Sequence, residues 1–503
     1  MTLPNLADLS FPARDYAFAP YIDACNWIGG RFVPATSSER QAVLNPRYNQ
    51  PLGQVHMSGA ADVAAAVAVA QAAFPAWKAT PMKERVQVLF RLKAIMEREL
   101  DELAWLLAHE NGKVHGQAIA SIVKGIECIE YGASLSNAAP GERMAVSRGV
   151  HCQVSQEPLG VVAGIVPFNF PMMVPLWMVP NALAAGNTFI IKPSEQVPYC
   201  VTRLAAWLQE AGLPDGVFNV VQGGRAAVEA IVEHPAIKAI AFVGSSKVAK
   251  LVYARGAELG KRMLCLGGAK NHLLVVPDAD VKITASNVAA SAYGTAGQRC
   301  MAAAVVLAIG DVQHIVDAIA EQARAITLGD GMGPVVSPEA RDRIVGYIDD
   351  AERRGAKILV DGRGATAAGL PDGNWVGPTL IDYASADMPA ACEEIFGPVL
   401  TIVRVDTVDE ALAIENANPY GNAASIYTTS GYVAEYCTER FEAGMCGVNI
   451  GVPVPREPFA FGGWNGSKFG HGDLTGRDGF HFWTRPRKVT SKWALQADSN
   501  WMS

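Results

Sequence analysis

The sequence lacks the features of a secreted, disulfide-bonded or zinc-binding protein. Its nine cysteines are an odd number, and no two of them are spaced as C-x-x-C. This pattern argues against a disulfide framework and against a zinc site, and it favours a reducing compartment. Residues 1–5 show no basic segment followed by an apolar core, so no secretory signal is expected. We therefore predict a cytoplasmic protein without a metal.

Basic charge and membrane-spanning character are also scarce. The net charge is −7 over 503 residues, with no basic stripe, so nucleic acid and anionic membranes are not expected as partners. Residues 158–191 carry no charge and are numerous enough to span a bilayer. Four prolines inside this stretch prevent one continuous helix, namely Pro167, Pro171, Pro175 and Pro180. A buried strand, a turn, a short helix and a second strand fit it better.

The chain does contain a regular alternation of strand and helix patterns. Its length exceeds what one hydrophobic core can organise, so two or three domains are expected. Alternating strands and helices are typical of parallel sheets covered by helices. Two such runs are predicted, on either side of Gly268. Strands are expected at 159–166, 188–192, 217–221 and 239–243 in the first run, and at 273–276, 305–309, 400–404 and 424–427 in the second.

A glycine-rich stretch, Gly294-Thr-Ala-Gly-Gln-Arg-Cys300, holds the main candidate for a reactive residue. Gly294 and Gly297 permit a close turn, and Arg299 places a cation one residue from the sulfur of Cys300. A nearby cation stabilises the thiolate, which is the nucleophilic form of cysteine. The alternative is a buried cysteine that acts as a small hydrophobic residue.

Further candidate residues follow the predicted strands, where ligands of open α/β sheets collect. The uncharged amide of Asn169 can stabilise an oxyanion, although a turn asparagine has the same pattern. Lys192 and Glu195 can hold ribose hydroxyls, or they can belong to a solvated loop. Gly244 and Ser245 lead into a helix N-terminus that suits an anion.

One more element combines carboxylates with an aromatic ring. Glu393-Glu394-Ile-Phe396-Gly-Pro398 can clamp a ring or a ribose. The alternative is helix capping before a strand.

Together these motifs resemble those of the NAD(P)-dependent aldehyde dehydrogenase superfamily over residues 25–490. Within it, the chain is most similar to the CoA-acylating methylmalonate/malonate-semialdehyde dehydrogenases. That similarity lies in Leu-Gly-Gly-Ala-Lys-Asn-His272, Arg-Cys-Met-Ala302, Gly447-Val-Asn-Ile and a Phe-Trp-Thr-Arg ending. The superfamily motifs are Pro-Phe-Asn169-Phe-Pro, Lys192-Pro-Ser-Glu195, Phe-Val-Gly244-Ser245, Leu-Gly-Gly268, Gly297-Gln-Arg-Cys300, Glu394-Ile-Phe396-Gly-Pro and Phe461-Gly-Gly.

The resemblance implies an α/β fold with two open sheet domains and a small β oligomerisation arm. Residues 1–145 and 158–268 would form an NAD-binding domain, and residues 269–478 a catalytic domain. Residues 146–157 and 479–503 would form the arm, which in this family joins subunits into dimers that often pair into tetramers. A homo-oligomer is therefore expected.

The resemblance also assigns roles to individual residues. Cys300 would attack the aldehyde carbon, and Asn169 with the Cys300 backbone N–H would hold the oxyanion. After hydride transfer to NAD, a thioester would remain on Cys300. Cofactor contacts are expected from Phe168, Lys192, Ser194, Glu195, Gly244, Ser245, Glu394 and Phe396. Glu195 would repel the 2′-phosphate of NADP, so NAD is the expected cofactor.

Two departures from the family pattern bear on the reaction. Hydrolytic members have a water-activating glutamate where this chain has Cys265, and a thiol is a weak base at neutral pH. The vacant base position predicts acyl transfer to CoA as co-substrate, unless Glu393 or Glu394 supplies the base. The subgroup usually has an arginine at Lys124, and lysine keeps the charge but loses the bidentate geometry.

The substrate prediction follows from these cations. Lys124 and Arg299, with Trp177 beside them, are expected to hold a small acidic semialdehyde. Two alternatives stay open: a hydrolytic semialdehyde dehydrogenase that releases the free acid, and a catalytically silent relative kept for a structural role.

Overall fold

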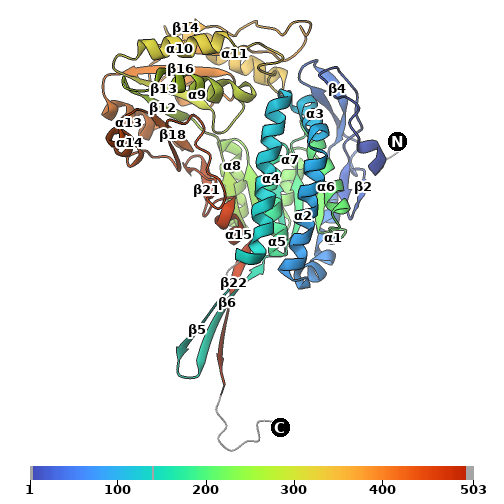
Figure 1. Ribbon diagram of the computed structural model, residues 1–503. Helices are drawn as coiled ribbons and strands as arrows, with labels where there is room; N and C mark the ends of the chain where they lie inside the picture. The colour runs from blue at the N-terminus through green and yellow to red at the C-terminus, as the bar shows by residue number, and fades with distance from the viewer. Residues whose placement is uncertain (1–3, 139–140, 494–503) are drawn as a thin grey trace, which may run out of the picture.

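The computed structural model describes residues 4–138 and 141–493. The domain ranges predicted above also include residues 1–3, 139–140 and 494–503, which lie outside the described residues. Two α/β bodies lie side by side, and a narrow β arm projects from below them (Figure 1). This architecture confirms the predicted fold class.

The first sheet has eight strands in the order β2-β1-β9-β8-β7-β10-β11-β21. Its five central strands are parallel, which confirms the first predicted run. The strand β11 was not predicted, because its five residues merge in sequence with the following glycine turn. The bounds are β1 Asn26–Ile28, β2 Arg31–Val33, β7 Val161–Ile165, β8 Thr188–Lys192, β9 Phe218–Val220, β10 Ile237–Val243, β11 Arg262–Leu266 and β21 Lys468–Gly470.

Helices cover both faces of this sheet. One face packs against α1, α7 and α8, and the other against α5 and α6, on which α2 packs in turn. The predicted helix at 195–211 begins only at Tyr199, because the residue before Pro198 is driven out of helical geometry. The bounds are α1 Ala60–Ala79, α2 Met82–Arg98, α3 Leu100–Asn111, α4 His115–Ala138, α5 Met173–Ala185, α6 Tyr199–Glu210, α7 Arg225–Glu233 and α8 Ser246–Glu258.

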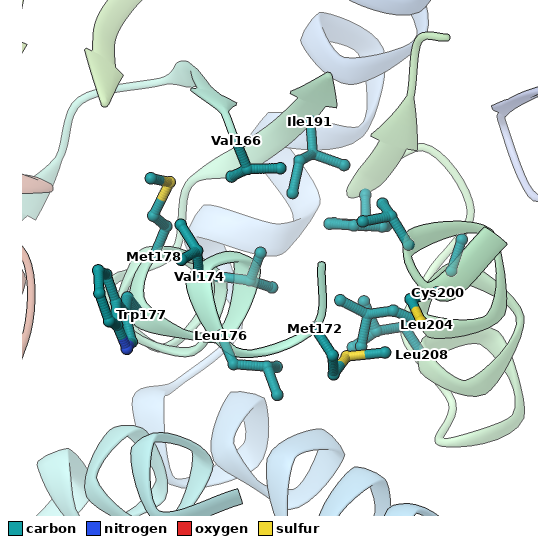
Figure 2. Packing of buried hydrophobic residues seen from close by; sticks show 14 of the residues in the cluster. Val166, Met172, Val174, Leu176, Trp177, Met178, Ile191, Cys200, Leu204 and Leu208 are labelled. Carbon is teal, nitrogen blue, oxygen red and sulfur yellow. The ribbon is translucent and has the colours of Figure 1, made fainter. Parts of the chain in front are cut away.

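The helix α5 lies between the sheet and the functional site. Figure 2 shows Met172 beside Leu204 and Leu208 of α6, while Trp177 lies on the opposite side of α5. Burial of these apolar side chains fixes the helix, and with it the direction of Trp177.

One helix in the described parts of the chain, α1, is long and apolar enough to cross a membrane by length and composition alone. It packs against β8 and α7 of the first body.

The second sheet has seven strands in the order β14-β15-β16-β13-β12-β18-β19. All its neighbouring pairs are parallel except β14 with β15, which confirms the second predicted run. The strands are β12 Asn271–Val275, β13 Ala303–Ile309, β14 Lys357–Val360, β15 Thr379–Asp382, β16 Val399–Val405, β18 Ala423–Tyr427 and β19 Met445–Val448. Its helices are α9 Val281–Tyr293, α10 Gln313–Arg324, α11 Pro338–Arg353, α12 Pro389–Cys392, α13 Val408–Ala417 and α14 Gly431–Thr438.

The arm is a three-stranded antiparallel sheet in the order β22-β6-β5 (Figure 1). Its strands are β5 Glu142–Ser147, β6 Val150–Pro158 and β22 Thr484–Lys492. The arm therefore begins at Glu142, four residues before the predicted start. Near the C-terminus, β21, which was predicted in the catalytic domain, joins the first sheet. The helix α15 (Gly476–Phe482), which the predicted boundary divides between the catalytic domain and the arm, packs on α5.

Smaller hairpins complete the described chain. The strands β3 (Arg40–Asn45) and β4 (Gln50–His56) pair with each other, as do β17 (Tyr420–Gly421) and β20 (Trp464–Asn465).

Candidate active site around Cys300

Cys300 follows a tightly wound loop at the end of α9. Thr295, Ala296 and Gly297 have left-handed backbone angles, with φ of 56°, 51° and 69°. A Cβ on Gly297 would lie 1.9 Å from the Gly397 carbonyl oxygen, so only glycine fits there. The nucleophile loop thereby packs directly against the loop that carries Phe396.

Two asparagine side chains fix the backbone of Cys300. The Nδ2 atoms of Asn271 and Asn422 donate to its carbonyl oxygen at 2.9 and 2.8 Å. Asn271 begins β12 and Asn422 precedes β18, so both neighbouring strands hold the cysteine in place. Asn271 lies in the Leu-Gly-Gly-Ala-Lys-Asn-His272 motif, but this contact was not predicted; Asn422 was missed, because nothing local distinguishes it from other strand-end asparagines.

The sulfur of Cys300 lies in an environment that favours the thiol. Burial, with a smaller contribution from the Glu394 carboxylate, raises its pKa to about 12. The backbone N–H groups of Cys300 and Met301 act in the opposite direction, as does Arg299. Arg299 thus lowers the pKa of the thiol as predicted, but burial outweighs it. A proton must leave the thiol before it can attack.

One cavity, of about 400 Å³, lies on one side of Cys300 and contains most of the predicted cofactor residues. Glu394 accepts from the Ala269 backbone N–H at 2.9 Å, and the rings of Phe168 and Phe396 meet edge to face at 5.7 Å. Ser245 caps the N-terminus of α8 without a side-chain hydrogen bond there. The lining residues are Pro167, Phe168, Asn169, Phe170, Val174, Trp177, Val243, Gly244, Ser245, Gly267, Gly268, Cys300, Arg343, Glu394 and Phe396.

Lys192, Ser194 and Glu195 do not line this cavity. They follow β8 at the carboxyl edge of the first sheet, where Lys192 Nζ lies 3.1 Å from Glu195 Oε2 and donates to the Gly223 carbonyl at 2.6 Å. Both predicted ribose ligands are therefore already paired with each other.

Asn169 is buried in the wall beside Cys300. Its Nδ2 donates to the Gln298 carbonyl at 3.0 Å, which leaves a second N–H on the same nitrogen. Its own backbone carbonyl accepts from the buried Lys113 ammonium, which also lies 3.9 Å from the centre of the Phe170 ring. Lys113 was not anticipated, because it lies more than fifty residues away in sequence.

A second cavity, of about 440 Å³, opens on the other side of Cys300. Trp177 and Phe461 form an aromatic wall, with ring centres 4.5 Å apart. The two cavities share Phe170, Trp177 and Cys300. The lining is Gly116, Gln117, Ala120, Ser121, Lys124, Phe170, Met173, Trp177, Thr295, Arg299, Cys300, Met301, Ile450, Val452, Val454, Pro455, Arg456, Glu457, Phe461 and Thr475.

The structure places Lys124 in this second cavity but corrects its predicted role. Its Nζ lies 2.7 Å from Glu127 Oε2 and 3.2 Å from Glu457 Oε2. Burial alone would lower the pKa of Lys124, but these two carboxylates outweigh it and raise the pKa. The ammonium is thus neutralised by the protein and is not a free site for a substrate carboxylate.

Arg299 is the better-placed cation. Its Nε donates to Thr295 Oγ1 at 3.1 Å, and its guanidinium lies against Gly294, where a Cβ would be 2.5 Å from Nη2. Within the described residues, neither Arg299 nor the cavity-lining Arg456 forms an ion pair. Arg456 was missed by the sequence reasoning, because it follows a proline-rich stretch with no motif of its own.

Cys265 lies on β11, fully buried among apolar residues of the first sheet. Burial raises its pKa to about 12, so it cannot serve as a base at neutral pH. It lines neither cavity that contains Cys300. All nine cysteines are free, and the described residues contain no group of three or more His, Cys, Asp or Glu side chains that could hold a metal.

Known proteins are similar to this chain in both sequence and fold. The family model described as "Aldehyde dehydrogenase family" matches residues 32–489. Malonate-semialdehyde dehydrogenase 1 of Geobacillus thermodenitrificans is 43% identical over 476 residues, which cover 93% of this chain and 98% of that protein.

Two solved structures are similar over nearly the whole chain. The methylmalonate-semialdehyde dehydrogenase of Oceanimonas doudoroffii has a TM-score of 0.93 at 39% identity, and the match covers 94% of this chain and 99% of that one. A Sinorhizobium meliloti 1021 protein assigned as a methylmalonate-semialdehyde dehydrogenase, complexed with NAD, has a TM-score of 0.94 at 39% identity and coverages of 96% and 100%. With its nucleophile loop, paired cavities and this extent of similarity, the chain belongs to the aldehyde dehydrogenase family.

Proposed function

We propose that this protein oxidises a small acidic semialdehyde with NAD, through a thioester on Cys300, and transfers the acyl group to CoA. The observation that carries the proposal is the position of Cys300, where two cavities meet. One cavity contains most of the predicted cofactor residues, and the other contains two arginines, Arg299 and Arg456, that form no ion pair within the described chain. The similar proteins named as malonate- or methylmalonate-semialdehyde dehydrogenases support the same substrate class.

The chain's own residues account for the first steps of the reaction. The Cys300 sulfur releases its proton to solvent and attacks the aldehyde carbon, which forms a thiohemiacetal oxyanion. The second N–H of Asn169 and the Cys300 backbone N–H would hold this oxyanion. Its collapse expels a hydride, for which bound NAD would be the acceptor, and leaves the thioester; the CoA thiol then takes the acyl group and gives its proton to the Cys300 sulfur.

The first cavity fits a nicotinamide dinucleotide. The uncapped N-terminus of α8 at Ser245 suits a pyrophosphate, and the Glu394 carboxylate suits ribose hydroxyls beside the Phe168 and Phe396 rings. NAD would supply the hydride acceptor at this site. Lys192, Ser194 and Glu195 would contact the adenosine half at the sheet edge, where Glu195 favours NAD over NADP.

The CoA assignment rests on the lack of a base at Cys265. Glu394 is the alternative base, since it lines the first cavity and burial raises its pKa. Its contact with Ala269 fits a ribose-binding role better. The Glu393 carboxylate accepts a hydrogen bond from the Tyr347 hydroxyl at 2.7 Å, and Glu393 lines neither cavity.

The proposal predicts that turnover depends on CoA. Steady-state NADH formation from malonate semialdehyde or methylmalonate semialdehyde should rise by ~10²-fold or more when CoA is added, because no base activates water. The measurement is absorbance of NADH, with mass spectrometry of the acyl product. Full turnover without CoA, with the free acid as product, would instead establish the hydrolytic alternative. If the protein oxidises no aldehyde in a broad panel, the result would support the alternative of a catalytically silent relative.

A second prediction tests Arg299 as the carboxylate-binding group. Gly294→Ala places a methyl group against the guanidinium and should displace it without strain in the backbone. We expect KM for an acidic semialdehyde to rise about 10-fold or more, because a charged hydrogen bond contributes about 1.5–3 kcal/mol. Activity on an uncharged aldehyde such as propanal should change far less.

The matched control for this variant is Gly431→Ala, because the Cβ would meet no atom within 4 Å there. Both variants should melt close to the wild type. An unchanged KM for the acidic substrate in Gly294→Ala would show that Arg299 does not bind its carboxylate.

We also infer that the arm joins subunits. Every residue of β5 is exposed, and its outer edge is unpaired within the described chain. Exposed strand edges are usually covered by a partner. The predicted homo-oligomer, a dimer or a tetramer, would bury this edge.

A further inference from the structure

The wall of the second cavity contains a polar corner formed by Lys124, Glu457 and Cys128. Glu457 Oε2 lies 3.2 Å from Lys124 Nζ, and Glu457 Oε1 accepts from Cys128 Sγ at 3.3 Å. Lys124 and Glu457 line the cavity, whereas Cys128 lies behind them. Glu127 contacts Lys124 at 2.7 Å but does not line the cavity. The polar corner is thus built from both α4 and the segment after β19.

The corner carries an excess of negative charge. One ammonium is shared between two carboxylates, so one negative charge is left uncompensated. The nearby arginines, Arg299 and Arg456, form no ion pair with these carboxylates in the described chain. The remaining wall is mainly apolar, and it is formed by Phe170, Met173, Ile450, Val452, Val454 and Phe461.

Glu457 keeps acceptor capacity for a ligand. A carboxylate offers about four lone-pair positions, and Lys124 and Cys128 each use one of them. Only 11% of its side chain is exposed, so an unused lone pair on the cavity side is poorly hydrated. A second carboxylate on a substrate would be repelled there, whereas a donor would be bound strongly.

The size of the cavity supports a substrate that reaches this corner. About 440 Å³ lies within the range of sites that hold drug-sized ligands, and a three-carbon semialdehyde would fill only part of it.

We propose that Glu457, oriented by Lys124, binds a hydrogen-bond donor on the substrate, so that the enzyme also takes aldehydes bearing a hydroxyl or amino group remote from the aldehyde. This inference rests on the proposed function and extends its substrate class. Glu457 would act as a specificity-determining residue, while Arg299 binds a carboxylate if one is present.

The test compares aldehydes of equal length. The probes are ω-hydroxy and ω-amino aldehydes of three to six carbons, each against the unsubstituted alkanal, and the readout is the ratio of kcat/KM within each pair. The wild type should favour the donor-bearing aldehyde at the length that reaches the corner. Glu457→Gln should lower that ratio ~10–100-fold, because it removes a charged acceptor without changing the volume.

Two further variants separate this role from a structural one. Glu127→Gln removes the carboxylate that does not line the cavity and leaves Glu457 as the only carboxylate paired with Lys124 in the described chain, so it should lower the ratio much less than Glu457→Gln does. Lys124→Met leaves both carboxylates uncompensated and should raise the ratio for amino aldehydes above the wild-type value. Opposite shifts in Lys124→Met and Glu457→Gln cannot result from general loss of packing.

The outcomes distinguish a failure of this inference from a failure of the proposed function. If the wild type oxidises these aldehydes with NAD but Glu457→Gln leaves the ratio unchanged, this inference is wrong and the proposed function stands. If the wild type prefers the alkanals at every length, the inference is also wrong. If it oxidises no aldehyde with or without CoA, both fail.

Discussion

Cys300→Ala is expected to abolish NADH formation, with a loss of more than ~10⁴-fold in kcat, because no other group can form the thioester. The remaining cysteines cannot substitute for it. None of them lines either cavity, and a thiol must lie within bonding distance of the aldehyde carbon. NAD affinity should be nearly unchanged, since Cys300 occupies only the inner end of the first cavity.

The matched control is Cys446→Ala, which removes an exposed cysteine that lines neither of the Cys300 cavities. It should retain wild-type kcat. Single-turnover NADH absorbance gives the rate, and calorimetry gives NAD affinity for both variants. More than trace activity in Cys300→Ala would show that another residue is the nucleophile.

Asn169→Ala is expected to lower kcat by ~10²–10³-fold with little change in KM, which is the effect of removing one oxyanion donor. The loss should affect binding of the transition state and not of the substrate, because the hydrogen bond from Asn169 Nδ2 to the Gln298 carbonyl already holds the amide in one orientation. The same substitution removes the Gln298 contact, so the melting temperature is measured in parallel.

Asn416→Ala is the matched control, because Asn416 also donates from Nδ2 to a backbone carbonyl, that of Arg440 at 3.0 Å, but on the surface. It should leave kcat unchanged. A loss below about 5-fold in Asn169→Ala, or a loss seen wholly in KM, would exclude Asn169 as the oxyanion donor.

Much of the fold was predictable from local sequence. Strands such as β8 and β10 are continuous apolar runs bounded by turn residues, and this signal lies within the segment itself. The strand β11 was not predicted, and the first turn of the expected helix at 195–211 was predicted wrongly. In both cases a short segment borders glycine or proline, and long-range pairing or a proline decides the boundary.

The site was predictable only in part, for a similar reason. Cys300, Asn169 and Glu394 lie in recognisable motifs, whereas Lys113, Asn422 and Glu457 act through contacts with residues far away in sequence. The predicted roles of the cationic side chains agree least with the structure. A lysine in a sequence shows its charge but not its partners, and two carboxylates remove the role expected for Lys124.

The meeting of two cavities at one sulfur also bears on how such an enzyme can diverge. The segment 450–457 contributes six residues to the lining of the second cavity and none to that of the first, namely Ile450, Val452, Val454, Pro455, Arg456 and Glu457. Substitutions in that segment can therefore alter which aldehyde is accepted while hydride acceptance is preserved. Exchanging this segment between relatives should therefore transfer the substrate preference of one enzyme to the other. Phe170, Trp177 and Cys300, which line both cavities, should be left unchanged in such an exchange.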